Sequence, residues 1–490
     1  MKHIKPIPLV IGLLLALGIA LFDSPLHDFG AYGSRPARAA AVTALMAFYW
    51  LTEALPISVT ACIPLVVFPF IGVFGEGFAV GLKGTVSPYV DPYIFLFLGG
   101  MCVAAAMQQW NLHRRIAVTI MSRVGTEPQR LLLGILAASA FISMWISNTA
   151  TAAMLVPIGI AVIRQLEVQS ERRFVHFGAA IMLAIAYGAN VGGIGTKIGT
   201  APNAQFAQFM QQNVGVEVSF LQFMAVGAPF VLLFIPIVWW VLWRLGRADA
   251  PHKDVGAAVV ATATAEMGPM SRGEKVVLGV FVGTAALWMA GSPLHGTLAP
   301  IVKNLYDYKL TSAHVEGGVA MLAALFLMVF RVGGQAALTF KSLRFVPWDT
   351  LLLLGGAFSM ARGVQESGLS AFLGEQLRGL AAHPVPLQVL GATVATVALT
   401  AFTSNTATIG VMLNVLKDAV TPHALSTVLF AATIAASLDF ALPAGTPPNA
   451  IVFGSGYLTV RQMVKTGAVL DVVGALFAAA YCLLIVPLVL

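Results

Sequence analysis

Charged residues are scarce in this sequence of 490 residues: Asp, Glu, Lys and Arg together make up 10%, and hydrophobic residues make up 58%. A soluble domain carries about 25% charged residues, and the mean hydropathy here is +0.86. The scarcity of charge excludes an ordinary soluble protein and indicates an integral membrane protein. Long apolar segments predict many helical spans, and they fall at roughly residues 7–21, 39–56, 57–74, 92–110, 174–192, 223–243, 276–291, 314–330, 347–362, 424–442 and 466–490.

Cysteine is also rare. Cys62, Cys102 and Cys482 lie far apart inside apolar segments, and they lack the spacing of a metal site or a disulfide framework. We expect them to be packing residues. The sequence contains no HExxH, CxxC or GxSxG pattern, so we predict that the protein is not an enzyme.

A polar stretch, Ser147–Thr151 (SNTAT), lies near the centre of Leu131–Ile163, a run of 33 residues without charge. Arg130 and Arg164 flank the run. Basic loops favour the cytoplasmic face of a membrane, and a run that crossed once would place one of these arginines on the other face. We therefore predict a re-entrant hairpin over 131–163 with SNTAT at its tip. Two arms of about 15 residues would each reach about 22 Å into a core about 30 Å thick.

The distribution of basic residues also predicts the orientation. With Lys2 and Lys5, we expect a cytoplasmic amino terminus, and four spans later basic residues return at His113–Arg115. The first segment is expected to be a retained helix rather than a cleaved signal. The charged stretch 244–275 is expected to be a cytoplasmic connection between two halves.

The same pattern occurs twice. Pro384–Leu416 is a second charge-free run of 33 residues, and its centre, Ser404–Thr408, again reads SNTAT. Three landmarks recur at offsets of 256, 257 and 246 residues: LGG at 98–100 and 354–356, the two SNTAT tips, and the GT-x-PN segments at 199–203 and 445–449. This indicates an internal duplication. Five spans separate the copies, so the second is inverted, as in many secondary transporters with broken helices.

The polar atoms of these segments indicate what they bind. Carbonyls at helix breaks, with Ser, Thr and Asn oxygens, suit Na⁺, and helix N-termini suit an anion. One carboxylate would meet Asn148 and Thr149 and another Asn405 and Thr406, so a small dianion fits two tips. Paired Na⁺ ions would offset the desolvation of that dianion. The alternative is that these groups only hydrogen-bond neighbouring helices.

The tips, the segment Ala186–Gly193, IGTAPN at 198–203, the run Leu442–Gly456 and Glu53–Pro56 resemble the divalent anion:sodium symporter family. The resemblance covers about residues 40–490. It implies an all-α membrane protein with about eleven transmembrane helices and two re-entrant hairpins. It also implies a homodimer in which a transport domain with an inverted repeat moves by an elevator mechanism against a scaffold.

The resemblance also implies ligand sets, with Thr403 and Gly445 acting through backbone carbonyls. By motif, one Na⁺ site would use Ser143, Ser147, Asn148 and Gly199, a second would use Thr400, Thr403, Asn405 and Gly445, and the substrate would meet Asn148, Thr149, Thr200, Asn405, Thr406 and Thr446.

Two charged residues depart from the family pattern. Lys197 lies in the first helix break, and Asp439 lies in the span that leads to the second. Charges inside a membrane are functional candidates by default. Lys197 would replace a Na⁺ and favour exchange, Asp439 would carry a coupling proton, or the two would form a structural ion pair or snorkel. Arg362, near the outer end of span nine, is expected to snorkel.

These observations predict a transporter of the bacterial cytoplasmic membrane that imports C4-dicarboxylates (succinate, malate, fumarate) with two or more Na⁺ ions by an elevator mechanism. A dicarboxylate or tricarboxylate exchanger without Na⁺ coupling, and proton coupling through Asp439, are the alternatives. The expected domains are scaffold helices at 1–110 and 276–366, a first repeat at 111–243 with a broken helix near 190–203, the connection 244–275, and a second repeat at 367–490 with hairpin 384–416 and a broken helix near 443–449.

Overall fold

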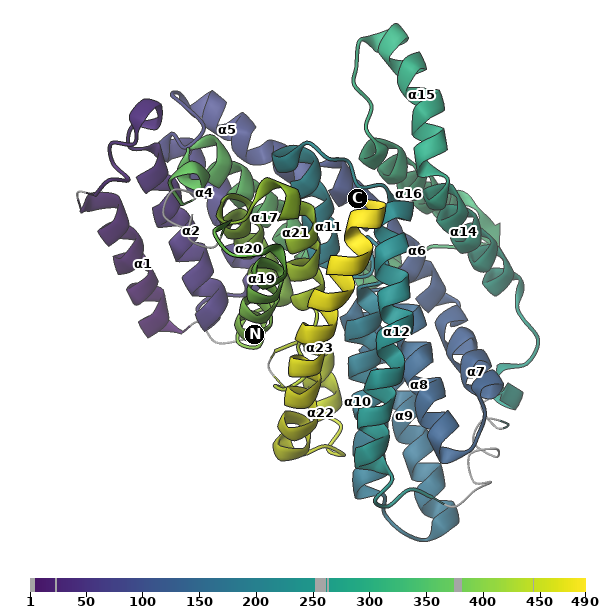
Figure 1. Ribbon diagram of the computed structural model, residues 1–490. Coiled ribbons are helices and arrows are strands. Elements are labelled where there is room, and N and C mark those ends of the chain that lie inside the picture. The colour runs from purple at the N-terminus through teal and green to yellow at the C-terminus, as the bar shows by residue number, and fades with distance from the viewer. Residues whose placement is uncertain (1–4, 23, 252–260, 262–263, 374–380, 444) are drawn as a thin grey trace.

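The computed structural model describes residues 5–22, 24–251, 261, 264–373, 381–443 and 445–490 as an almost wholly helical chain (Figure 1). Within this part, one small β hairpin interrupts the helices, with β1 (Arg331–Val332) antiparallel to β2 (Gln335–Ala336). Gly333 and Gly334 form its turn with φ of 60° and 87°, a conformation that glycine adopts without strain. The all-α class predicted from the sequence is confirmed.

Helices α1, α2, α4 and α5 lie together at one side of the molecule, and the helix that follows them, α6, lies beside α16 (Ser312–Val329) (Figure 1). Helix α6 starts at Pro92, and the Asp91 side chain caps it by accepting a hydrogen bond from the Tyr93 amide at 3.0 Å. Proline at the first helical position costs no hydrogen bond. These elements are α1 (Pro6–Leu21), η1 (Gly30–Tyr32), α2 (Arg35–Thr52), α3 (Ile57–Thr60), α4 (Ile63–Ile71), α5 (Phe78–Val86), η2 (Ser87–Val90) and α6 (Pro92–Gln109).

The next helices contain the first polar tip and the first helix break. Ser219 and Gln222 form a capping box at the start of the longest of them. The elements are α7 (Leu112–Val124), α8 (Pro128–Ser143), α9 (Asn148–Ser170), α10 (Val175–Gly193), α11 (Ala201–Phe209), the π-helical η3 (Met210–Val214) and α12 (Phe220–Gly246). Of the expected connection 244–275, residues 252–260 and 262–263 lie outside the described part.

The third group separates the two copies of the duplicated pattern. Its first helix starts with the capping box of Ser271 and Glu274, and it meets the next helix at an angle of 69°. The elements are α14 (Arg272–Met289), α15 (Gly291–Tyr306), α16 (Ser312–Val329), η4 (Phe340–Phe345) and α17 (Trp348–Glu366).

The last group contains the second tip and break. Its final helix is capped by Thr459 and Gln462. The elements are α19 (Val385–Thr400), α20 (Asn405–Ala419), η5 (Pro422–Ala424), α21 (Leu425–Ala435), α22 (Pro447–Phe453) and α23 (Val460–Val489).

Helix α10 forms the centre of the molecule and is buried over almost its whole length. It packs against α8, α9 and α12, and α12 in turn packs against α23. Large apolar side chains are exposed on the outer helices, among them Leu14 on α1, Leu232 on α12 and Leu484 on α23. Extensive exposed apolar surface marks a membrane-facing exterior.

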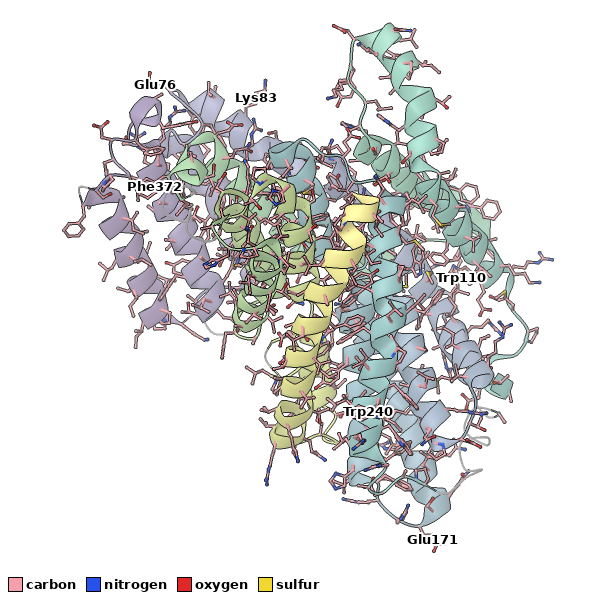
Figure 2. All side chains as sticks on the ribbon, viewed as in Figure 1. Glu76, Lys83, Trp110, Glu171, Trp240 and Phe372 are labelled. Atoms are coloured by element: carbon pink, nitrogen blue, oxygen red, sulfur yellow. The ribbon has the colours of Figure 1, made fainter. Side chains whose placement is uncertain are left out.

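Charged residues mark two opposite ends of the molecule. Figure 2 shows Glu171, in the turn after α9, at one end, and Glu76 and Lys83 at the other. Six helices of the described part are long and apolar enough to cross a membrane, or seven when the bent pair α14–α15 counts as one span. The predicted total of eleven spans includes shorter apolar and broken helices, and it stays a prediction.

Candidate functional site

Each SNTAT tip is the N-terminus of a helix. The Ser147 hydroxyl accepts a hydrogen bond from the Ala150 amide at 3.4 Å and caps α9. The Ser404 hydroxyl accepts one from the Ala407 amide at 3.2 Å and caps α20. Serine is a preferred N-cap because its hydroxyl satisfies an amide that the helix leaves unpaired. The amides of the first turn then carry a partial positive charge at each tip.

In each of the two charge-free runs the structure forms a pair of helices joined at the SNTAT tip, α8 with α9 and α19 with α20, and their re-entry into the membrane stays a prediction. The side chain of Gln388, in the first turn of α19, accepts a hydrogen bond at 3.0 Å from the Thr421 amide, just after α20. In the first hairpin, the carbonyl of Gln129 accepts a bond from Trp239 of α12, and Arg172 donates to the carbonyl of Asp249 just beyond α12. Both open ends of the first hairpin therefore lie at the same end of α12.

The two helix breaks are built alike. After α10 ends, the side-chain amide of Asn203 donates to the carbonyls of Gly193 and Thr196 at 2.8 and 2.7 Å. After α21 ends, the amide of Asn449 donates to the carbonyls of Asp439 and Leu442 at 3.1 and 3.0 Å. All three residues are shifted by 246 positions, so the duplication inferred from the sequence extends to these hydrogen bonds.

The first break covers 194–200 and agrees with the predicted position. The second covers 436–446 and starts earlier than predicted, because α21 already ends at Ala435. Within it, the Thr446 hydroxyl accepts a hydrogen bond from the Asn449 amide at 3.3 Å and caps α22. Ala444, part of the run that carried the family resemblance, lies outside the described residues.

The two copies interlock. Helix α9 of the first hairpin packs against α22 of the second break, and α20 of the second hairpin packs against α11 of the first. The tips and the breaks line one cavity of about 200 Å³. It brings together these predicted site residues: Ser147, Asn148, Thr149, Gly199, Thr200, Asn405, Thr406, Gly445 and Thr446.

Three predicted ligands lie behind this lining. The Ser143 hydroxyl donates to the amide oxygen of Asn148 at 2.8 Å, and Thr400 donates to that of Asn405 at 3.0 Å. These hydrogen bonds orient the two tip asparagines in the same way. Thr403 donates to the carbonyl of Leu399 and is also bonded to Thr408, so its hydroxyl is used within its own hairpin.

Asn190 lines the cavity and was not among the predicted site residues. Its amide nitrogen donates to the carbonyl of Asp439 and to the hydroxyl of Thr446, both at 3.2 Å. It thereby ties α10 of the first copy to the extended segment of the second. The sequence shows only an isolated Asn among alanine and glycine residues, and its burial and its partners come from the structure.

Lys197 does not pair with Asp439, and the expected ion pair between them is wrong. Its ammonium lies 2.7 Å from the Glu316 carboxylate on α16, and both side chains are 0% exposed. Lys197 therefore neither snorkels to water nor points into the cavity as a free cation. Glu316 was missed because a partner 119 residues away leaves no local pattern.

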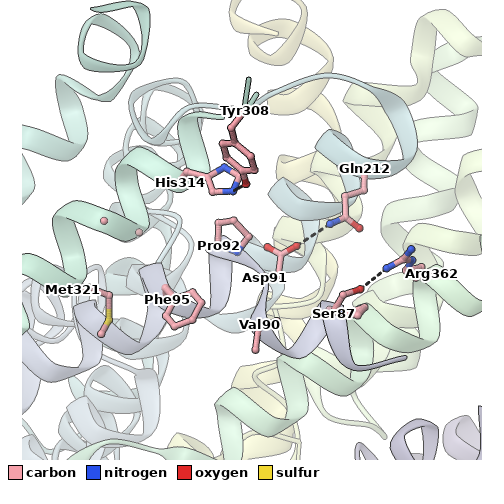
Figure 3. A pocket seen from close by; sticks show the side chains of 13 residues that line it. Ser87, Val90, Asp91, Pro92, Phe95, Gln212, Tyr308, His314, Met321 and Arg362 are labelled. Atoms are coloured by element: carbon pink, nitrogen blue, oxygen red, sulfur yellow. Dashed lines mark hydrogen bonds between the residues drawn. The ribbon is translucent and has the colours of Figure 1, made fainter. Parts of the chain in front are cut away.

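A larger cavity of about 540 Å³ lies near the start of α6 (Figure 3). Its polar side chains already satisfy one another: Gln212 donates to Asp91 at 2.8 Å, and Arg362 donates to Ser87 and to Glu366. Arg362 is thus held in place by hydrogen bonds rather than snorkelling freely. The smaller cavity, where the N-termini of the tip helices meet the amide oxygen of Asn190, which is unpaired among the described residues, is the stronger candidate for substrate binding.

The cavity between the tips offers hard oxygen ligands. The described residues contain no group of three His, Cys, Asp or Glu side chains that could hold a transition metal. Amide, hydroxyl and carbonyl oxygens are instead the ligands of hard cations such as Na⁺. The tip asparagines and the carbonyls of the two breaks fit such an ion.

Comparison with known proteins agrees with this geometry. The family described as the sodium:sulfate symporter transmembrane region matches residues 9–488. The chain belongs to this family. Membership confirms the family predicted from the two tips, and it identifies a multi-pass membrane transporter rather than an enzyme.

Proteins with similar sequences include the sodium-dependent dicarboxylate transporters SdcS of Staphylococcus aureus strains USA300 and bovine RF122 / ET3-1. Each is 34% identical over 499 aligned residues, which cover 99% of this chain and 92% of the relative. The YdaH transporter of Alcanivorax borkumensis has a similar fold, with a TM-score of 0.50 at 12% identity over 90% of this chain and 97% of that one.

Proposed function

We propose that this family member imports C4-dicarboxylates such as succinate, malate and fumarate by Na⁺ symport. The observation that carries the proposal is the convergence of two SNTAT tips and two helix breaks on one cavity. Its volume of about 200 Å³ lies below the roughly 300–1,000 Å³ of drug-sized ligand sites, which suits a small acid. The name of the SdcS relatives supports both the substrate class and the cation.

In the proposed mechanism the helix N-termini hold the dianion. Asn148 and Thr149 would bind one carboxylate at the start of α9, and Asn405 and Thr406 the other at the start of α20. The caps Thr200 and Thr446 add hydroxyls from the breaks. Backbone amides and aligned dipoles at such termini favour negative charge.

Two Na⁺ ions would neutralise the dianion and travel with it as substrates. By the motif, the proposed ligands are Ser143, Ser147, Asn148 and Gly199 in the first copy, and Thr400, Thr403, Asn405 and Gly445 in the second. Because the described residues of the lining include no positive side chain, moving the dianion out of water without cations would be costly. This cost is the physical basis of the coupling.

The proposed elevator mechanism divides the helices into two bodies. In the scaffold, α6 packs along α16, and in the transport domain α10 packs along α8, and α21 along α19 and α23. Between the bodies lie hydrogen bonds such as Tyr93 to the carbonyl of Ala207 at 3.2 Å and Ser312 to Glu217 at 2.6 Å. These bonds would break each time the transport domain moves. A homodimer held by the scaffold completes the proposal.

The cavity is proposed to open toward the cytoplasm. Its lining includes Asp349 and Thr350 in the first turn of α17, which follows the basic residues Lys341 and Arg344. Basic loops favour the cytoplasmic face. On this basis the structure corresponds to an inward-facing state in the bacterial cytoplasmic membrane, with a cytoplasmic amino terminus.

Exchange of dicarboxylates or tricarboxylates without Na⁺ is the rival function, and Lys197 acting as a fixed cation would favour it. The Glu316 carboxylate at 2.7 Å neutralises that charge, which favours symport. The test is uptake of labelled succinate into proteoliposomes under inward gradients of Na⁺, Li⁺, H⁺ or choline. Symport predicts accumulation with Na⁺, whereas uptake that needs internal dicarboxylate and ignores Na⁺ would establish exchange.

A further inference from the structure

Asp439 carries a buried carboxyl group in the break between α21 and α22. Its side chain is 1% exposed, and neither carboxylate oxygen has a hydrogen-bond partner among the described residues. Its backbone carbonyl, by contrast, accepts hydrogen bonds from Asn190 and Asn449. Buried carboxylates in proteins are paired with a cation, bind a metal ion or take up a proton. The unpaired oxygens of Asp439 therefore point to a positively charged ligand.

The described part of the protein provides no positive side chain for this role. Lys197, which also lies in a helix break, is bound to Glu316. The charged side chain that interacts electrostatically with Asp439 is Asp471 of α23, and it is also a carboxylate. The Asp471 carboxylate accepts a hydrogen bond from the Phe440 amide at 2.9 Å. A mobile cation, Na⁺ or a proton, remains as the partner of Asp439, and the Na⁺ titration below distinguishes the two.

The duplication shows where the Asp439 side chain lies relative to the second tip. Asn203 and Asn449 make matching hydrogen bonds, and the offset of 246 residues places Asp439 at the position of Gly193. A Cβ atom built on Gly193 would meet the amide oxygen of Asn148. By the same duplication, the Asp439 side chain is expected to face the tip asparagine of the second copy, Asn405.

A direct contact supports the same location. A Cβ atom built on Gly445 would collide with both carboxylate oxygens of Asp439. The carboxylate therefore lies against Gly445, a proposed ligand of the second Na⁺ site. The corresponding neighbour of Gly199 in the first copy is the backbone carbonyl of Gly193. A neutral carbonyl in one copy is matched by a carboxylate in the other.

We propose that Asp439 is a charged oxygen ligand of Na⁺ in the second-copy site, which therefore binds Na⁺ without substrate more tightly than the neutral first-copy site does. Carboxylate, amide and carbonyl oxygens together form a hard-cation ligand set. The first-copy site, which lacks a carboxylate, gains its counter-charge when the dianion arrives. Na⁺ at the second site then binds before the dicarboxylate, and Na⁺ at the first binds with it.

The test measures Na⁺ binding without transport. Purified protein in detergent is titrated with Na⁺, with choline keeping the ionic strength constant and no dicarboxylate present, while its melting temperature is recorded. A ligand that binds the folded state raises this temperature with its concentration. We expect D439N to need at least tenfold more Na⁺ than the wild type for the same rise. An equal response of D439N and wild type would overturn the proposal.

The proposal also predicts the melting temperature of D439N in the absence of Na⁺. D439N removes an unpaired charge, so without Na⁺ its melting temperature should equal or exceed that of the wild type. A lower Na⁺-free melting temperature would mean that Asp439 has a structural role, and it would overturn the proposal. D439G gives the second copy a glycine at this position, as the first copy has at Gly193. If D439N is not monodisperse, the Na⁺ titration is carried out with D439G instead.

D471N is the matched control, because Asp471 is a neighbouring carboxylate that already accepts a backbone hydrogen bond. We expect its Na⁺ requirement to change less than threefold. If D471N needs as much additional Na⁺ as D439N, the effect is a general one of negative charge, and the proposal that Asp439 binds Na⁺ directly is overturned.

The inference rests on the proposed Na⁺ coupling, and the two can fail separately. If the wild type gains no stability from Na⁺ and takes up succinate without it, the proposed function fails. If the wild type responds to Na⁺ and D439N responds equally, the inference alone fails.

Discussion

The ammonium of Lys197 lies 2.7 Å from the carboxylate of Glu316, and this pair joins the break after α10 to the start of α16. The other Glu316 oxygen accepts a hydrogen bond from the Phe220 amide at 2.7 Å, and the ring of Tyr93 lies 5.4 Å from the ammonium. In the proposed elevator, Lys197 belongs to the moving body and Glu316 to the scaffold. The pair would then stabilise the conformation that the structure shows.

Breaking the pair on one side should destabilise the protein. A buried charge without its partner costs about 3–5 kcal/mol, so K197M and E316Q should each lower the melting temperature strongly. The double variant K197M/E316Q removes both charges and should recover much of the loss. Melting curves of the four proteins form a double-mutant cycle. Additive losses would show that the two charges do not interact.

Much of this fold can be predicted from composition and repetition. The eleven apolar segments correspond to helices or broken helices, because apolar length is a local property. Other helices could not be predicted this way. Helix α7 carries Arg114 and Arg115 and has one buried face, and α15 begins at Gly291 and includes Pro300. Neither forms the continuous apolar run by which spans were recognised.

The parts of the site that occur in both copies could be predicted from the sequence. The parts that occur in one copy alone could not. The tips and breaks stand out because they recur at fixed offsets. Asn190 donates a hydrogen bond to Asp439, which lies 249 residues further along the chain, and Glu316 pairs with Lys197, which lies 119 residues before it. Neither Asn190 nor Glu316 has a counterpart in the duplicated pattern. Their roles become visible only when the helices are packed together.

The tip asparagines should be essential for transport. Hydrogen bonds to charged groups contribute about 1.5–3 kcal/mol, so N148A and N405A should each reduce the apparent affinity for succinate about ten- to hundredfold. Asn414 on α20 is the matched control, since its amide donates to the carbonyl of Gly410 within the same helix. Uptake kinetics should be nearly unchanged in N414A. Normal uptake by both tip variants would refute the site.

Gly193 should not tolerate a side chain. A Cβ atom there would collide with the amide oxygen of Asn148, so G193A should displace the first tip and abolish Na⁺-dependent uptake. Gly279 on α14 has no atom within 4 Å of a built Cβ, and G279A serves as the control for an alanine in a helix. Proteoliposome uptake compares the two variants. Wild-type uptake by G193A would mean that the tip does not need its present position.

The first hairpin should have both ends on one side of the membrane, because Gln129 and Arg172 both contact the same end of α12. In a variant without Cys62, Cys102 and Cys482, we expect R130C and R164C to react with an impermeant maleimide from the cytoplasmic side. E76C should react from the other side, since Glu76 lies at the opposite end from Glu171 (Figure 2). Labelling in right-side-out and inverted vesicles distinguishes the faces. If R130C and R164C label from different faces, α9 is an ordinary span, and its N-terminus cannot present Asn148 together with Asn405.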